Sequence, residues 1–282
     1  MNPSFTLQQQ THLALAQYYR WYQVYEVPFT EKRIENQKDI LSEEIEISSI
    51  QGTTKGKSGL EERLKVYTGW LNAHHVQQTK VELLSGGEIS LEADIIYQNI
   101  RPDQSKHSYT IHYSTLLKQQ KNDLPLFTKI ELKPTGEIKE FQFESAYAEN
   151  RCKSFMHYWL YLIETAEENI EKIDELLAED YFLDLAAGEY IYSTEKIKSW
   201  IKSNAGEIIA STHSYKNFKV KANNDNTFNV SVDLDWFIIN KHEKKMVAEI
   251  HHEWLLENNM DERFAKMKTL KATTIKPFYF PS

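Results

Sequence analysis

An internal repeat is the feature that most constrains the fold of this 282-residue chain. The segment His74–Gln120 aligns without a gap with His213–Asn259, and 10 of the 47 columns are identical. Unrelated segments of ordinary composition would share about three. Upstream, Trp21 aligns with Trp159 at a shift of 138 residues. The repeat predicts two copies of one module of about 140 residues, which is a usual domain size.

The junction between the copies is expected in a polar stretch, Pro134–Glu144. We therefore predict one domain over residues 1–144 and a second domain over residues 145–282. The total length agrees with this division, because a domain typically holds about 150 residues.

Each copy begins with a helical pattern of aromatic residues. Aromatic and apolar side chains recur at intervals of three and four residues over residues 13–25, and again over residues 155–163. Ser58, three residues before Glu61, is typical of a capping box and predicts the start of a second helix. The counterpart of this second helix is expected over residues 193–202.

After the helices, apolar residues alternate with polar ones. In the second copy the apolar positions are Phe228, Val230, Val232, Leu234 and Trp236, and in the first copy they are Ile89, Leu91, Ala93, Ile95 and Tyr97. A period of two predicts strands, and a polar opposite face indicates an antiparallel sheet that is covered on one side. We predict an α+β fold of two tandem cone-shaped modules, each a curved antiparallel sheet wrapped around N-terminal helices.

The order of these elements resembles the nuclear transport factor 2-like superfamily, whose fold is also called cystatin-like. In both copies a helix, the segment ILSEE or LLAED, and a further helix precede a histidine that opens a strand. The sequence STHSYKNFKV around His213 is similar to the SnoaL-like branch. That superfamily includes isomerases, dehydratases, epoxide hydrolases, polyketide cyclases, non-catalytic subunits and ligand-binding proteins, so fold analogy alone does not select an activity.

The resemblance implies an acid–base pair in each copy. In several SnoaL-like enzymes a carboxylate of the first helix meets the histidine that opens the strand. Glu164 with His213, and Glu26 with His74, occupy these places, although family members more often carry aspartate on the helix. An imidazole exchanges protons near neutral pH, and a neighbouring carboxylate orients its tautomer. The alternative is that both glutamates are solvated helix-end residues and both histidines only open their strands.

Further side chains are candidates for lining a ligand pocket. In the second copy they are His252, Trp236, Trp254, Trp159 and Tyr158, and in the first copy Tyr113, Tyr97 and Tyr22. Such rings suit a small apolar or aromatic molecule, and ordinary core packing is the alternative. We expect the better-formed pocket in the second copy, because it combines imidazole and indole rings.

Other kinds of site have little support. His251 and Glu253 share a strand face, but two ligands do not make a zinc site, so no metal is expected. The sequence has no glycine-rich phosphate loop, and Cys152 is its single cysteine. A net charge of −8, from 33 basic and 41 acidic residues, argues against nucleic-acid binding. The start resembles no signal peptide and no apolar stretch could span a membrane, so a cytoplasmic protein is expected.

The leading functional interpretation is a small-molecule pocket protein of the SnoaL-like kind. As an enzyme it would be a cofactor-free lyase, isomerase or cyclase that uses a histidine–glutamate pair. The competing interpretation is a non-catalytic ligand-binding or assembly protein built from a duplicated module. In either case the two modules are expected to pair as an intramolecular pseudo-dimer, and association into a homo-oligomer is left open.

Overall fold

The computed structural model describes residues 3–121, 123–165, 169–185, 188–205 and 207–281. The chain forms two compact units. The first unit consists of Leu13–Arg151 and Asp261–Arg263, and the second unit consists of Met1–His12, Cys152–Met260 and Phe264–Ser282. Each unit therefore takes in a short segment from the far half of the sequence.

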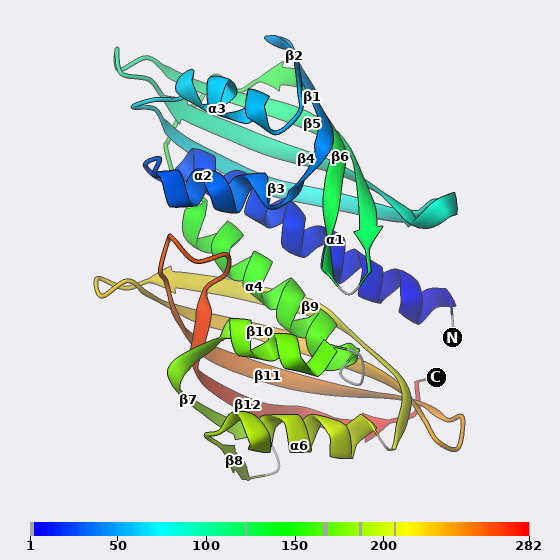
Figure 1. The fold of residues 1–282 in the computed structure, drawn as a ribbon. Coiled ribbons are helices and arrows are strands. Elements are labelled where there is room, and N and C mark those ends of the chain that lie inside the picture. The colour runs from blue at the N-terminus through cyan, green and yellow to red at the C-terminus, as the bar shows by residue number, and fades with distance from the viewer. Residues whose placement is uncertain (1–2, 122, 166–168, 186–187, 206, 282) are drawn as a thin grey trace. The chain divides into compact units, whose positions relative to one another are not determined.

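The first unit contains a six-stranded sheet in the order β2-β1-β6-β5-β4-β3 (Figure 1). Its elements are α1 (Pro3–Glu26, from Leu13 onward), α2 (Glu31–Lys38), β1 (Leu41–Ser49), β2 (Gly52–Lys55), α3 (Ser58–Lys65), β3 (Leu71–Leu83), a 3-10 turn (Ser85–Gly87), β4 (Glu88–Ile100), β5 (Lys106–Gln120) and β6 (Asp123–Glu137). Neighbouring strands are antiparallel except β1 and β6, which are parallel.

The second unit repeats this arrangement in a sheet of the order β8-β7-β12-β11-β10-β9. Its elements are α4 (Tyr147–Glu164, from Cys152 onward), a 3-10 helix (Ile170–Leu176), β7 (Leu177–Leu185), β8 (Glu189–Ile191), α6 (Thr194–Ala205), β9 (Ile208–Ala222), β10 (Thr227–Asn240), β11 (Lys245–Glu257) and β12 (Lys266–Tyr279). Its one parallel pair, β7 with β12, corresponds to β1 with β6. The predicted α+β fold of two tandem modules is confirmed.

The two opening histidines occupy equivalent places in the two sheets. His74 on β3 pairs with Tyr97 on β4, and His213 on β9 pairs with Trp236 on β10. Because β3 and β9 each lie at the end of a strand order, both histidines sit on an edge strand. The alignment of the two copies therefore holds in three dimensions.

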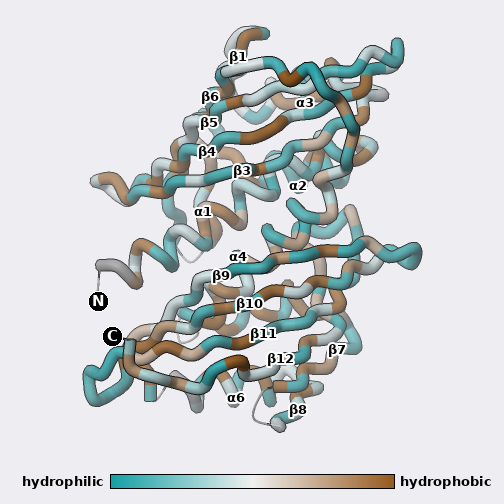
Figure 2. The backbone as a smooth tube through the Cα atoms, turned by 180° about the vertical axis from the view of Figure 1, so that it is seen from behind, coloured by the Kyte–Doolittle hydropathy of each residue, from teal (hydrophilic) through white to brown (hydrophobic). Residues whose placement is uncertain are grey.

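The alternation in sequence places the core on one face of each sheet. Apolar residues recur along the strands of both sheets (Figure 2), and the inward positions of β4 and β10 are buried except at Tyr97 and Trp236, which are partly exposed. In the first unit Tyr18 and Tyr22 of α1 meet Tyr113 of β5 edge to face. In the second unit Phe155 of α4 meets Trp254 of β11 in the same manner. The first helix of each module thus packs on the inner face of its sheet.

Two local features differ from the sequence-based expectation. Strand β1 and its equivalent β7 were not predicted, since the pairing of β1 with β6 is irregular between Leu41 and Glu46 and this irregularity breaks the alternation. Helix α3 begins at Ser58 without a side-chain cap, so the capping-box prediction is wrong. In the second unit, by contrast, Ser193 Oγ accepts the amide N–H of Lys196 at the start of α6.

The assignment of strand faces can be tested on β4. Leu91 is fully buried, whereas its neighbour Ser90 lies on the opposite, partly exposed face. We expect Leu91→Ala to lower the free energy of unfolding of the first unit by about 2–5 kcal/mol, because it leaves a cavity in the core. Urea unfolding followed by circular dichroism measures this change. Ser90→Ala is the matched control, and an equal loss in both variants would contradict the face assignment.

Candidate functional site

The predicted pair of the second unit forms where helix α4 ends against edge strand β9. Glu164 is the last residue of α4, and its side chain is 0% exposed. Its Oε1 accepts the backbone N–H of His213 at 2.6 Å and lies 2.9 Å from His213 Nδ1. A carboxylate at a helix C-terminus is disfavoured by the helix dipole, so these donors are what hold it there. The alternative of a solvated helix-end residue does not describe Glu164.

The protonation state of Glu164 fixes the role of each ring nitrogen of His213. Burial raises the pKa of Glu164, but the charges and hydrogen bonds of His12 and His213 outweigh that effect, and the pKa is lowered from its usual value. The carboxylate is therefore ionised at neutral pH and only accepts hydrogen bonds. His213 must donate from Nδ1. In the neutral ring the lone pair then lies on Nε2, which makes this atom a Brønsted base.

The first unit contains the same pair. Glu26 ends α1, and its Oε1 accepts the backbone N–H of His74 at 2.8 Å and lies 3.0 Å from His74 Nδ1. Asn150 adds amide donors at 3.0 Å to Oε1 and at 3.2 Å to Oε2 of Glu26, and it also donates to the carbonyl of His74. The structure thus brings together both pairs that the resemblance implied, with glutamate in place of aspartate.

The surroundings of the two histidines differ. His74 stacks against Tyr22 and Tyr97, with ring centroids 4.6 and 4.9 Å away. Tyr18 and Tyr113 extend this cluster of rings. Burial raises the pKa of Tyr22 and Tyr113 well above the usual phenol value, so these rings stay neutral. The predicted ligand candidates of the first copy therefore form a packed tyrosine cluster around the histidine.

The second unit has fewer rings around its histidine. Met156 and Leu160 stand where the first helix of the other copy has two tyrosines. Trp236 stacks on His213 with centroids 5.7 Å apart, and its Nε1 donates to Ser211 Oγ at 2.8 Å. Both side chains are fully buried, so interior positions that phenols fill in the first unit hold apolar side chains here.

The remaining candidates of the second copy are buried in its interior. His252 and Trp254 lie on β11 with ring centroids 5.8 Å apart. Trp159 and Tyr158 lie on α4, and the ring of Tyr158 stacks on Phe264. Burial, with smaller contributions from two neighbouring histidines, lowers the pKa of His252 to about 3, so its ring is neutral. Among the described residues, His252 Nδ1 and the indole nitrogens of Trp159 and Trp254 have no hydrogen-bond partner. Such buried polar atoms suit a bound molecule or water.

A cavity of about 380 Å³ has His213 among its lining residues. It is further lined by Phe5 and Gln8 of α1 and by apolar side chains of β10 and β11. This volume lies within the lower range of small-molecule sites. Thr212 and its cross-strand neighbours Phe237 and Val247 also line it. Alternation places these three side chains on the face opposite to the His213 ring, so the cavity lies mainly on the outer face of the sheet, beside the edge strand.

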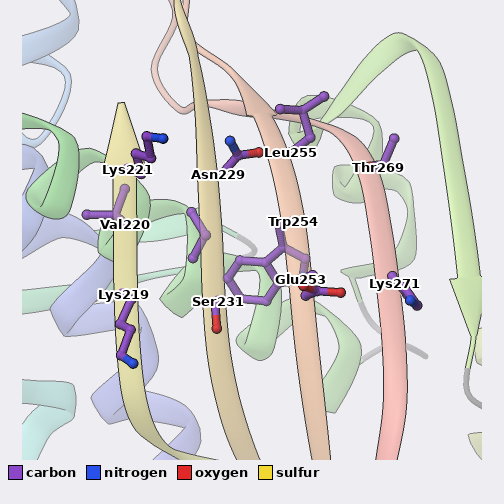
Figure 3. A pocket seen from close by; sticks show the side chains of 11 residues that line it. Lys219, Val220, Lys221, Asn229, Ser231, Glu253, Trp254, Leu255, Thr269 and Lys271 are labelled. Carbon is purple, nitrogen blue, oxygen red and sulfur yellow. The ribbon is translucent and has the colours of Figure 1, made fainter. Parts of the chain in front are cut away.

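A second hollow, of about 490 Å³, lies farther along the same sheet (Figure 3). Lys219 and Lys221 of β9 and Lys271 of β12 border it, together with Glu253 of β11. Lys219 is six residues beyond His213, which corresponds to about 20 Å of strand. Neither His213 nor Glu164 therefore lines this hollow.

Sequence reasoning missed His12, which reaches Glu164, and His157, which contacts His12. His12 Nε2 lies 3.4 Å from Glu164 Oε1 and 3.1 Å from the carbonyl oxygen of His213. His12 Nδ1 lies 2.9 Å from Nδ1 of His157, and each of these two side chains is 1% exposed. The available signal was the position of His12 and His157 in apolar helical stretches, because a buried histidine normally has a polar partner.

Metal ligands and membrane spans were also sought. Over the described ranges, no group of three or more His, Cys, Asp or Glu side chains is placed to hold a metal ion. Among the helices of that same part of the chain, none is long and apolar enough to cross a membrane.

The neutral state of buried His252 can be tested through the pH dependence of stability. An unfolded chain binds a proton at this ring below a pH of about 6.5, whereas the folded chain does so only near 3. Burial of the neutral ring therefore costs no stability above a pH of about 6.5, and the free energy of unfolding falls as the pH drops below this value. Between pH 7 and pH 5 the free energy of unfolding should fall by about 2 kcal/mol less in His252→Tyr, which copies the first unit, than in the unaltered protein. Urea unfolding at both pH values measures this difference.

Trp254→Phe is the matched control for this test, since it alters packing beside His252 without changing a titratable group. It should lower the free energy of unfolding equally at both pH values. An unchanged pH dependence in His252→Tyr would show that folding does not lower the pKa of this ring.

Comparisons with known proteins concern the fold. No family model matches the sequence, and no curated protein matches it either. Similar solved structures include hexachlorocyclohexane dehydrochlorinase LinA type 2, with 8% identity and a TM-score of 0.42 over 48% of this chain and 88% of that chain. ActVI-ORFA from Streptomyces coelicolor has 12% identity and a TM-score of 0.37 over 43% and 94%. An uncharacterised cystatin-like protein from Caulobacter vibrioides has 11% identity and a TM-score of 0.39 over 46% and 91%.

Each match covers about half of this chain. The structure itself shows an α+β fold of two tandem modules, whose sheets have equivalent strand orders in the described part of the chain.

Proposed function

We propose that the second unit holds a small-molecule pocket in which His213 and Glu164 transfer a proton without a cofactor. The observation that carries this proposal is the ionised, fully buried carboxylate that accepts from His213 Nδ1 and leaves the lone pair on Nε2. A histidine held in one tautomer by a carboxylate is a general base suited to neutral pH. The reaction class is a lyase, isomerase or cyclase.

The proton transfer follows from this geometry. His213 Nε2 takes a proton from a carbon or hydroxyl of the substrate, and the electron pair of the broken bond stays on the substrate. Glu164 stabilises the imidazolium that forms. The same Nε2 then returns the proton to another atom in an isomerase or cyclase, or to the leaving group in a lyase. The aromatic side chains nearby favour a small apolar or aromatic substrate.

The second unit is the better candidate for this activity. In the first unit two tyrosine rings stack on His74, whereas His213 stacks on one ring and lines a cavity. Replacement of two helix tyrosines by Met156 and Leu160 supports the same choice. On this proposal the pair of Glu26 and His74 keeps a structural role.

One observation favours a second candidate function, a non-catalytic binding or assembly protein. His213 is only 6% exposed, the same fraction as His74. In such a protein both pairs would serve to tie a helix end to an edge strand. The predicted intramolecular pairing of the modules, association into a homo-oligomer and a cytoplasmic location are compatible with either function and stay predictions.

Hydrogen exchange into a carbon acid tests the catalytic proposal. Small aromatic ketones, with acetophenone as the simplest, are incubated with the protein in D2O, and deuterium uptake beside the carbonyl is followed by NMR. We expect the protein to accelerate uptake for at least one ketone of the panel. His213→Ala and Glu164→Gln should reduce this acceleration by about 100-fold or more, because the general base or its orienting partner is lost.

His74→Ala is the matched control in the first unit and should keep the exchange activity. Line broadening of the ketone signals reports binding in the same samples. Binding without exchange would support the non-catalytic function, and exchange that survives in His213→Ala would contradict the assignment of the base.

A further inference from the structure

We propose that the outer face of the second sheet holds a binding site for an elongated small molecule that carries an anionic group at each end. The site is the hollow of about 490 Å³ that Lys219, Lys221 and Lys271 border (Figure 3). Its volume lies within the usual range of small-molecule sites. Neither His213 nor Glu164 lines it, so this inference is independent of the proposed proton transfer.

The strand register brings four side chains into one row across the sheet. Lys219 of β9 pairs with Ser231 of β10, and Ser231 pairs with Glu253 of β11. Glu253 in turn pairs with Lys271 of β12. Directly paired residues of an antiparallel sheet point to the same face, so all four side chains lie on the outer face. A lysine therefore stands at each end of the row.

A second row adds another ammonium group. Lys221 lies two residues beyond Lys219 on β9, so both side chains point to the same face and start about 7 Å apart at the backbone. Lys221 pairs with Asn229, which lies on β10 together with Ser231. The hollow thus has two ammonium groups on its β9 side, one on its β12 side and neutral hydrogen-bonding groups on β10.

The three lysines that border the hollow are exposed, and none of them has an ion-pair partner among the described residues. By contrast, Lys216 of the same strand β9 contacts Asp235 at 2.9 Å and Glu249 at 3.2 Å. Unpaired ammonium groups around a concave surface create a positive local potential, which attracts anions even to a chain whose net charge is −8.

The first unit has paired charges on the corresponding face. Lys80 of β3 contacts Glu82 at 2.7 Å, and Lys129 of β6 contacts Glu131 at 3.1 Å. A glutamate on the same strand thus neutralises each of these two lysines, so neither is left to attract an anion.

Both of these glutamates are replaced by lysines in the second unit. The strand registers place Lys221 at the position of Glu82, and Lys271 at the position of Glu131. The replacements remove two negative charges and add two positive ones on the two sides of the hollow. The two units therefore differ at the positions that an anion site requires.

The distance between the two sides of the hollow indicates the shape of its ligand. Three strand intervals of about 4.8 Å separate β9 from β12, so these sides lie about 14 Å apart at the backbone. A molecule with two separated anionic groups can contact both sides. The amide of Asn229 and the hydroxyl of Ser231 suit polar groups in its middle. Both a carboxylate and a phosphate can accept from lysine.

Titration with two elongated anions tests the site. Adipate has a carboxylate at each end and fructose 1,6-bisphosphate has a phosphate at each end, so the two probes distinguish the kinds of anionic group. Each is added to the 15N-labelled full-length protein at constant ionic strength, and NMR follows the amide shifts. We expect saturable shifts around the hollow on β9 to β12 for at least one probe. Absence of saturable binding for both probes would overturn the proposal.

Variants that copy the first unit test each side of the hollow separately. Lys221→Glu and Lys271→Glu should each raise the Kd about fivefold or more, because an attractive exposed charge becomes a repulsive one. Lys118→Glu, at an exposed position of β5 in the first unit, is the matched control. It makes the same change in net charge and should leave the Kd within about twofold. Circular dichroism checks that every variant is folded.

Two results with these variants would contradict the proposal. An unchanged Kd in Lys271→Glu would show that only the β9 side binds, which excludes an elongated ligand. Equal weakening in Lys118→Glu would show that the anion responds to net charge alone. Glu253→Ser, which copies Ser114 of the first unit, should tighten binding, because it removes the carboxylate that borders the hollow. The titrations contain no ketone, so their outcome does not depend on the exchange reaction.

Discussion

Each unit depends on a carboxylate that is buried at the end of a helix. Glu26 and Glu164 accept both the backbone N–H and the ring Nδ1 of the histidine that opens the edge strand. The carbonyl of the same histidine accepts from Asn150 in one unit and contacts His12 Nε2 in the other. An edge strand otherwise presents unpaired backbone groups. These side chains therefore satisfy the edge, fix the helix against the sheet and orient the imidazole at the same time.

The two units share the contacts between the buried carboxylate and the histidine of the edge strand, but the side chains around these contacts differ. One unit has tyrosines around its histidine and a neutral amide on its carboxylate, whereas the other has Met156 and Leu160 on its first helix and an imidazole beside its carboxylate. None of these replacements alters the strand order or the pairing of the histidine. The contacts that tie the helix to the edge strand and the side chains around the histidine are thus provided by different residues, so the surroundings can change without loss of the fold.

Much of the fold could be predicted from the sequence because its signals are local. Alternation along β4 and β10 identified the inner faces, whereas both histidine–glutamate pairs were expected from the resemblance to SnoaL-like enzymes. The strands β1 and β7 escaped prediction, since they are irregular and pair in parallel with strands distant in the sequence. His12 escaped for the same reason, because its partner Glu164 lies 152 residues away along the chain. Contacts across such separations leave no periodic trace.

The assignment of residues to the two units bears on how far the repeats are independent. His12 belongs to the unit formed mainly by the second half of the sequence, and Asn150 belongs to the unit formed mainly by the first half. Cleavage of the chain between the two repeats would separate His12 from Glu164 and Asn150 from Glu26, because each contact joins the two halves of the sequence. Each repeat thus contains a complete sheet, whereas one side chain that contacts its buried carboxylate comes from the other half of the sequence.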